Sequence, residues 1–237
     1  MIEAIGIVVP VHNEEESLRA CLRSLRAAFS ALPSHVDARV VVVLDACADR
    51  SPEIAGSALD DRGEAMTLCV RNVGIARHAG VRRLQEHYAS VSPSRLWLAT
   101  TDADSRVPRT WLVDQLTLAD SGVDAVAGTI QITDWDDFPN DRVRAFLDFY
   151  TPAGCSDHHD HVHGTNLGIR GDAYDAAGGF ADLESGEDHA LWNALRREGR
   201  RLLSTRRLPV ATSARRVGRA PRGFADFLAL FQVQEAS

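Results

Sequence analysis

The sequence predicts an α/β fold in which helices flank a mainly parallel β-sheet within a single domain. Continuous apolar runs, typical of strands covered on both faces, alternate along the first half of the chain with segments of helical periodicity. The length of 237 residues fits one domain, and 45% of the residues are hydrophobic, which is enough for one core. No internal repeat or low-complexity linker divides residues 1–237.

The first half is expected to alternate strands and helices, with right-handed crossovers between parallel strands. The apolar runs predict strands at Ala4–Val9, Val40–Leu44, Met66–Val70, Leu96–Thr100 and Asp124–Ile132. Apolar residues at three- and four-residue steps predict a helix over about 14–29, and another helix is expected over about 74–88. Ser51-Pro52 is interpreted as a helix N-cap followed by proline at the first helical position, and Pro108 as the start of a further helix.

The second half has a less regular pattern. Its expected elements are an acidic aromatic loop at Asp134–Asn140, a histidine-rich segment at Asp157–Gly164, a strand at Gly164–Arg170, a turn at Gly178-Gly179, a helix from Glu187 to near Gly199, a last strand at Leu208–Thr212 and a Phe-rich helix at Gly223–Val233. The Phe-rich helix is expected either to pack on the domain or to form a homodimer contact.

Composition narrows the functional classes. The formal net charge of −7 argues against a general nucleic-acid-binding protein, which needs a basic surface. The four cysteines lack zinc-ligand spacing, so they are interpreted as thiols in a reducing cytosol. The apolar start is short and follows an acid, unlike a signal peptide, and no apolar stretch approaches the roughly 18 residues of a transmembrane segment. A cytoplasmic, soluble protein is expected.

Polar residues stand directly after each predicted strand of the first half. In parallel sheets, ligands bind outside the carboxyl ends of the strands, so these residues are expected to converge on one edge. They are His12-Asn13-Glu14, Asp45, Arg71-Asn72 and Asp102-Ala103-Asp104.

Asp102 and Asp104 form the sharpest local pattern. Two carboxylates this close repel each other unless a cation lies nearby, and hard oxygen ligands suit Mg²⁺ or Mn²⁺. The alternative is a solvated turn whose acids cap the following helix. Asp45 suits a ribose hydroxyl or a base N–H, or is simply a turn residue.

Three further segments carry chemistry. Of Glu187 and Asp188, one is a candidate general base, although acids at a helix start also complement the helix dipole. In an extended segment His159, His161 and His163 would share one face and suit a transition metal; the alternative is a polar loop. Residues 196–222 hold ten arginines and one acid, which indicates a phosphate-bearing ligand, an acidic partner or a solvated face.

The motifs form an ordered series over nearly the whole chain. They are Val8-Val9-Pro10-Val11-His12-Asn13-Glu14, Val43-Leu44-Asp45, Asp49-Arg50-Ser51, Asn72-Val73-Gly74, Ala76-Arg77, Thr101-Asp102-Ala103-Asp104, Gly164-Thr165-Asn166, Gly178-Gly179-Phe180 and Gly186-Glu187-Asp188. From Ile5 to about Phe224 the sequence resembles the glycosyltransferases of family 2, which have the Rossmann-like GT-A fold.

The resemblance implies roles for individual residues. Pro10, Val11 and Glu14 would line the nucleotide pocket of a UDP- or GDP-sugar. Asp45 would contact the base or ribose, and Arg77 would lie near the nucleotide. Asp102 and Asp104 would hold Mn²⁺ or Mg²⁺ on the donor diphosphate, with His161 or His163 as a further metal ligand.

The resemblance also implies a reaction. The expected enzyme is a metal-dependent hexosyltransferase that moves a sugar from a nucleoside-diphosphate donor to a hydroxyl of an unidentified acceptor, with Asp188 as the base of an inverting mechanism. Residues 1–130 would form the nucleotide-binding half and residues 131–237 the acceptor-binding half. A retaining transferase of the glucosyl- or mannosyl-glycerate type and a non-catalytic nucleotide-sugar binder remain alternatives.

Two segments depart from or extend the family pattern. Ala46-Cys47 follows Asp45 where the family often has a second acid, so the nucleotide preference stays open. Position and charge lead us to expect that Ser213–Pro221 is a loop that closes over the diphosphate.

Overall fold

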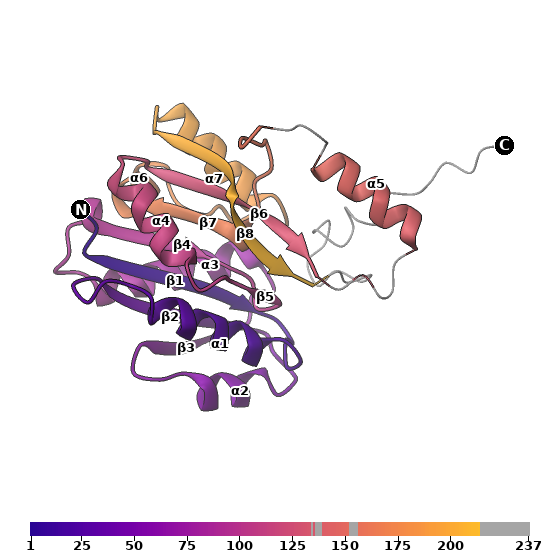
Figure 1. Cartoon of the computed structure of the whole chain (residues 1–237). Coiled ribbons are helices and arrows are strands. Elements are labelled where there is room, and N and C mark those ends of the chain that lie inside the picture. Colours follow the sequence, from indigo (N-terminus) through magenta and orange to yellow (C-terminus); the bar gives the residue numbers. More distant parts are fainter. Residues whose placement is uncertain (134, 136–138, 152–155, 214–237) are drawn as a thin grey trace.

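The computed structural model describes residues 1–133, 135, 139–151 and 156–213. Within them the strands form one eight-stranded sheet in the order β3-β2-β1-β4-β7-β6-β8-β5 (Figure 1). The strands are β1 Ala4–Val11, β2 Asp37–Asp45, β3 Gly63–Leu68, β4 Leu96–Thr100, β5 Ser105–Arg106, β6 Ala125–Ile132, β7 Leu167–Arg170 and β8 Leu202–Thr212.

Strand direction decides which residues meet at the carboxyl edge. The strands β3, β2, β1 and β4 are mutually parallel. The strand β7 is antiparallel to β4 and β6, so β6 and its parallel neighbour β8 run in the same direction as β1. The short β5, which follows β4 closely in the chain, pairs its Ser105 with Thr212 at the end of β8. The ends of β4 and β8 are therefore connected through β5. The predicted mainly parallel sheet is confirmed.

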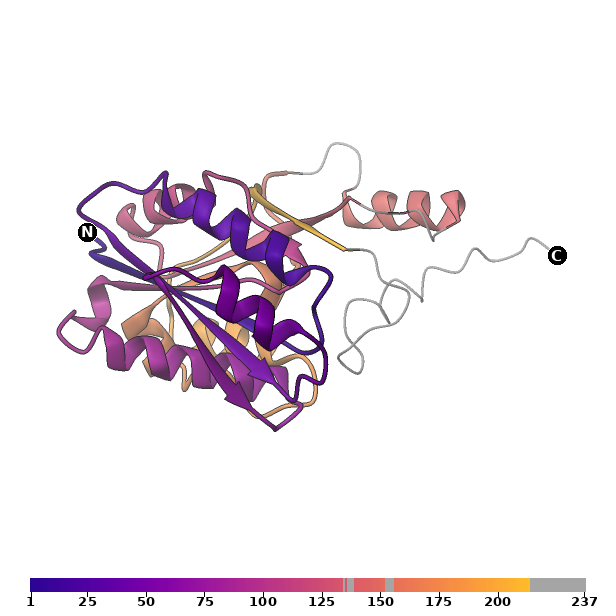
Figure 2. The same cartoon turned by 90° about the horizontal axis from the view of Figure 1, so that it is seen from below.

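Helices cover both faces of the sheet (Figure 2). One apolar core lies against α1 Leu18–Phe29, α2 Ser51–Ala58 and α4 Trp111–Asp120. The other lies against α3 Val73–His87, α6 Gly171–Ala176 and α7 Glu187–Arg197. The helix α5, Asn140–Tyr150, extends beyond the sheet (Figure 1). The α/β class is therefore confirmed.

The central strand β1 shows why a continuous apolar run is needed. Ile5 and Ile7 belong to the core on one face and Val8 to the core on the other, and each is at most 1% exposed. Burying each such side chain contributes roughly 1.5–3 kcal/mol. Polar side chains would therefore be unfavourable along β1 and appear only after its carboxyl end.

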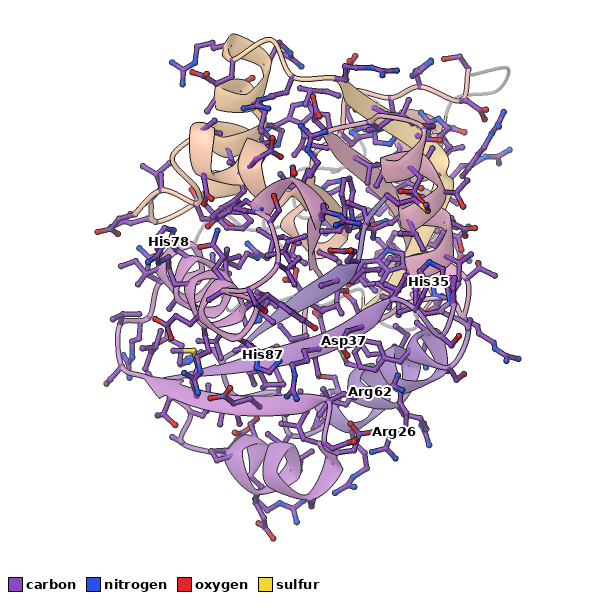
Figure 3. All side chains as sticks on the ribbon, turned by 90° about the vertical axis from the view of Figure 1, so that its left-hand side faces the viewer. Arg26, His35, Asp37, Arg62, His78 and His87 are labelled. Carbon is purple, nitrogen blue, oxygen red and sulfur yellow. The ribbon has the colours of Figure 1, made fainter. Side chains whose placement is uncertain are left out.

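The opposite, amino edge of the sheet is held by side-chain contacts between α3 and β2. The hydroxyl of Tyr88 donates a hydrogen bond to Asp37 at 2.9 Å, which ties the end of α3 to the start of β2. Figure 3 views this edge, where Asp37 and His87 lie. This contact fixes the far end of the helix whose first turns carry Arg77.

Several element boundaries differ from the sequence predictions. Arg50, not Ser51, is the N-cap of α2, because Ser51 is already helical and its hydroxyl accepts from the backbone of Glu14. The residue Pro108 precedes α4, which begins at Trp111. A 3₁₀ turn occupies Gly164–Asn166, and only Leu167–Arg170 is strand.

The second half contains elements that the sequence pattern did not indicate. The helices α5 and α6 were not expected, and β8 begins at Leu202 rather than Leu208. The expected loop at 134–140 is only partly described, and the predicted helix Gly223–Val233 lies outside the described residues. In the described part of the chain, no helix has the length and apolarity needed to cross a bilayer.

Candidate active site

Strained backbone marks the carboxyl edge of the parallel strands. Asn13, Ala46 and Arg71 are the non-glycine residues with positive φ in the described chain, at 56°, 49° and 51°. They follow β1, β2 and β3 respectively. Such conformations cost free energy and cluster at functional sites. Three of the four loops that were predicted to converge therefore contain a residue in the left-handed conformation.

The loops after β1 and β2 interlock through hydrogen bonds. Asn13 Oδ1 accepts from the backbone of Ala48 at 2.7 Å, and Glu14 N–H donates to Ser51 Oγ at 2.7 Å. Glu14 is buried, and its carboxylate accepts from the hydroxyl of Ser17 at 2.6 Å. Of the other predicted pocket residues, Pro10 and Val11 form the end of β1 at this edge.

Asp45 organises the neighbouring loop. Its Oδ1 accepts from the backbone N–H groups of Val70 at 2.7 Å and Arg71 at 3.0 Å, and its Oδ2 accepts from Asn72 at 2.9 Å. The side chain is only 5% exposed. Three of its acceptor positions thus hold the turn that leads into α3, and its contact with a base or ribose stays a prediction.

The Asp102–Asp104 segment carries two differently held carboxylates. Asp102 Oδ1 accepts from the Arg77 guanidinium at 2.6 Å, and Oδ2 accepts from the hydroxyl of Thr165. Asp104 Oδ1 accepts from the hydroxyls of Ser105 at 3.2 Å and Thr212 at 3.4 Å. The structure therefore joins Asp102 to α3 and Asp104 to the end of β8.

Arg77 lies inside the protein rather than on a ligand-facing surface. It is 4% exposed, contacts Asp102 and Glu187, and has its guanidinium 5.8 Å from the Phe180 ring centroid. Burial disfavours its charge, but the attraction of Asp102 and Glu187 outweighs burial and raises the pKa of Arg77. Its predicted contact with the nucleotide stays a prediction, because its described partners are protein groups.

The structure distinguishes the two acids at the start of α7. Glu187 is 4% exposed and paired with Arg77, and burial raises the pKa of its carboxyl. Asp188 is half-buried; its Oδ2 accepts from the backbone of Gly164 at 2.8 Å and its Oδ1 from His189 N–H at 2.7 Å. Of this pair, Asp188 is therefore the acid with access to a ligand.

The histidines form a row of stacked rings. His159 and His161 have ring centroids 5.7 Å apart, and His161 and His163 6.0 Å apart, so the prediction that they share a face is confirmed. Burial lowers the pKa of His163 to about 4, and its Nε2 lies 3.1 Å from the hydroxyl of Tyr150. Across residues 1–213, apart from the gaps in the description, no three His, Cys, Asp or Glu side chains are arranged to hold a metal ion.

A divalent cation nevertheless fits the carboxyl edge. Mg²⁺ and related hard cations are commonly held by one or two carboxylates together with substrate phosphates and water, without a full protein cage. Asp104 is half-buried beside two hydroxyls, and Asp102 is 31% exposed. These oxygen donors match that chemistry, whereas the imidazole of His163 already contacts Tyr150.

The sequence alone did not identify the buried polar residues whose hydrogen bonds support the carboxyl edge of the sheet. Asn166 is 1% exposed; its amide donates to the carbonyls of Thr129 and Leu208, and it accepts from the Trp111 indole at 2.9 Å. Thr100 Oγ1 donates to the carbonyl of Gly164 at 2.5 Å. The Gly164-Thr165-Asn166 motif was the signal, but its partners lie on distant strands.

The arginine-rich segment is split by β8. Arg196, Arg197, Arg200 and Arg201 precede β8, whereas the edge that carries Asp104 meets its last residue, Thr212. A strand of this length separates its ends by about 30 Å. These four arginines therefore lie at the opposite end of β8 from Asp104, and the role of the segment toward a phosphate stays a prediction. The expected closing loop at 213–221 falls, except for Ser213, outside the described residues.

The family assignment follows from the same segments. The sequence pattern described as "Glycosyl transferase family 2" matches residues 6–178, which is most of the chain. The chain belongs to glycosyl transferase family 2.

Curated relatives of this family 2 protein share only part of its length. It is 28% identical over 130 residues to an undecaprenyl-phosphate 4-deoxy-4-formamido-L-arabinose transferase of Edwardsiella ictaluri, over 55% of this chain and 38% of the relative. It is 32% identical over 126 residues to the transferase of that name from Pseudomonas aeruginosa, over 53% of this chain and 35% of the relative. The match thus spans well under half of these relatives.

Solved structures confirm the GT-A fold of the family 2 chain. S. aureus TarS 1–349 in complex with UDP-GlcNAc superposes with a TM-score of 0.68 at 14% identity, covering 94% of this chain and 62% of that chain. A mannosyltransferase from Pyrobaculum calidifontis in complex with GDP-Man and Mn²⁺ gives 0.62 at 19% identity, covering 95% and 68%. At these identities the likeness establishes the fold alone.

Proposed function

We propose that this protein transfers a sugar from a nucleoside-diphosphate donor to an acceptor hydroxyl in a metal-dependent, inverting reaction. One observation carries the proposal. Consecutive residues of a single turn hold the two key carboxylates: Gly164 donates its N–H to Asp188, and Thr165 donates its hydroxyl to Asp102. A donor-side acid and a half-buried base are thus both held by one turn.

The donor side is assigned to the carboxyl edge of residues 1–130. Pro10, Val11, Glu14, Asp45 and Asp102 lie at or just after the carboxyl ends of β1, β2 and β4. Two structural neighbours that share the fold are described in complex with UDP-GlcNAc and with GDP-Man, which supports a UDP- or GDP-sugar as donor. Residues 131–237 then form the acceptor half.

Asp104, with Asp102 beside it, would hold Mn²⁺ or Mg²⁺ against the donor diphosphate, as supported by the Mn²⁺ in the mannosyltransferase complex. When bound, the cation neutralises negative charge that gathers on the departing diphosphate. The hydroxyls of Ser105 and Thr212 hold one carboxylate oxygen of Asp104. His163 is less suited than the two aspartates to bind the cation, because the Tyr150 hydroxyl contacts its Nε2.

Asp188 acts as the general base in this proposal. The acceptor oxygen attacks the anomeric carbon, the bond from that carbon to the diphosphate breaks, and the hydroxyl proton passes to Asp188. Gly164 and His189 donate N–H groups to the carboxylate, which fixes its orientation while leaving further lone pairs for that proton. Attack on the face opposite the leaving group inverts the anomeric configuration.

A second acceptor class, a lipid phosphate, is supported by the curated relatives, which are named as undecaprenyl-phosphate transferases. A phosphate acceptor is already ionised near neutral pH, so it has little use for a general base. Replacement of Asp188 therefore separates the two: a hydroxyl acceptor needs the carboxylate, and a phosphate acceptor does not.

We place the reaction in the cytoplasm, because the described cysteines Cys21, Cys47 and Cys69 are free thiols. The proposed homodimer contact through the C-terminal helix concerns residues outside the described part.

A thermal-shift screen of UDP- and GDP-sugars, with and without Mn²⁺, tests the donor assignment. A true donor at 100 times its Kd stabilises the protein by about 2.7 kcal/mol, so the melting temperature should rise only in the matching well. Anomeric analysis of the product then tests inversion. Retention of configuration would exclude a single displacement with Asp188 as base, and no shift with any nucleotide sugar would overturn the proposed function.

A further inference from the structure

Three charged side chains form a continuous series of ion pairs between α7 and the end of β4. Glu187, the first residue of α7, pairs with Arg77 on α3, and Arg77 pairs with Asp102 at 2.6 Å. Arg77 and Glu187 are 4% exposed, whereas Asp102 is 31% exposed. Of these three residues, only Asp102 is therefore accessible to a ligand.

Asp102 is held at both carboxylate oxygens. Arg77 occupies Oδ1, and the Thr165 hydroxyl occupies Oδ2. A carboxylate fixed at both oxygens has a single orientation, and that orientation depends on where the guanidinium sits. The guanidinium in turn lies between Glu187 and Asp102 and against the Phe180 ring.

Two glycines pack closely against these ion-paired residues and their neighbours. A Cβ at Gly164 would lie 2.4 Å from Arg77 Cζ, and a Cβ at Gly74 would lie 2.4 Å from the carbonyl oxygen of Ala181. Real Cβ atoms do not approach so closely, so α3 meets the 164 and 181–187 segments only because both positions are glycine. Arg77 is thus clamped by backbone as well as by charge.

Glu187 and Asp188 are consecutive residues whose side chains face different partners. Glu187 is directed to Arg77, and Asp188 to the backbone of Gly164. Any shift of the first turn of α7 therefore moves both the base and, through Arg77, the orientation of Asp102.

We propose that Glu187 and Arg77 are positioning residues that fix Asp102 relative to Asp188, so that donor binding and proton removal are set by one rigid unit. The inference rests on the proposed glycosyl transfer. It assigns Arg77 a role through Asp102 in place of direct contact with the nucleotide, and it gives Glu187 a function distinct from that of its neighbour.

The test uses Glu187→Gln, with Glu198→Gln at the exposed far end of the same helix as the matched control. Calorimetry measures binding of UDP and of GDP in the presence of Mn²⁺, and steady-state kinetics follow turnover of the matching donor. Loss of a group that orients a ligand-binding carboxylate typically costs roughly 10- to 100-fold. We expect weakening of that size in nucleotide affinity and in kcat, and no change in the control.

A double-mutant cycle with Asp102→Asn separates positioning from general structural support. If Glu187 acts through Asp102, the Gln substitution should weaken nucleotide binding in the parent but have little further effect once Asp102 is replaced. Arg77→Lys, which keeps the charge but loses the forked geometry, should follow the same pattern, with Arg82→Lys as its exposed control on α3.

The outcomes are distinguishable. Binding and kcat of Glu187→Gln within twofold of the parent, or fully additive effects with Asp102→Asn, would overturn the positioning role alone. A parent protein that binds neither UDP nor GDP would overturn the proposed function and the positioning role with it. If Glu187→Gln fails to fold, Glu187→Asp, which retains the charge with a shorter reach, provides the same comparison.

Discussion

The backbone N–H of Gly164 lies 2.8 Å from Oδ2 of Asp188, so the first turn of α7 is joined directly to the turn that precedes β7. The carbonyl of the same glycine accepts from Thr100 at the end of β4. One residue therefore ties the candidate base to the strand that delivers Asp102. The geometry of the proposed reaction depends on this backbone contact.

Gly164→Ala is expected to abolish most turnover and to destabilise the fold. The new methyl would lie 2.4 Å from Arg77 Cζ, and overpacking of this kind costs about 1–3 kcal/mol. Urea denaturation and steady-state kinetics measure the two effects. Gly56→Ala in α2 is the matched control, because a Cβ there meets nothing within 4 Å and should leave both quantities unchanged or slightly raise stability.

Asp188→Asn should lower kcat by about 10²- to 10⁴-fold while donor affinity stays within a few-fold of the parent. The amide keeps the shape of the carboxylate but cannot accept a proton at neutral pH. Asp175→Asn, at an exposed position on α6, is the control. Full retention of turnover would contradict the base assignment and favour an acceptor that is already ionised.

Asp45→Asn should destabilise the protein by roughly 1–3 kcal/mol, because three backbone N–H groups lose a charged acceptor and one meets an NH₂ donor instead. Chemical denaturation measures this loss. Asp61→Asn, which is exposed, should have no comparable effect. Equal stability of the Asp45 variant and the parent would mean that the carboxylate does not hold the 70–72 turn.

The histidine row predicts a loss of stability in acid. Burial lowers the pKa of His163 from 6.5 to about 4, so the folded protein favours the neutral ring. The associated stability is present above pH 6.5 and is lost as the pH falls toward 4, by up to about 3 kcal/mol. His163→Gln should flatten this acid limb in denaturation of metal-free protein from pH 7 to 4. An unchanged limb would show that the ring titrates normally.

Much of the fold follows from sequence pattern because central strands are apolar on both faces. The predicted Leu96–Thr100 coincides with β4, and the run that begins at Ala4 is the central β1. The apolar pattern does not identify strands that carry polar side chains. The first half of β8 contains Thr205, Arg206 and Arg207, so the predicted strand began only at Leu208.

The candidate site was predictable in its positions but less so in its partners. Asp102 was identified because an acid follows an apolar strand, and the acids that open α7 left Glu187 and Asp188 as alternatives, between which only the family resemblance chose Asp188. Arg77 was expected near the nucleotide, yet its burial depends on Glu187, which is 110 residues away in the chain. The role of Asn166 depends likewise on carbonyls from β6 and β8. Such long-range pairings leave no local signal in one sequence.

The most direct test of the central claim is calorimetric titration of the donor found by screening into the parent and Asp104→Ala, with and without Mn²⁺; Asp61→Ala serves as control. We expect Mn²⁺ to strengthen donor binding to the parent and the control by at least tenfold and to have no such effect on Asp104→Ala. Equal Mn²⁺-dependent affinity in Asp104→Ala and the parent would contradict the central claim.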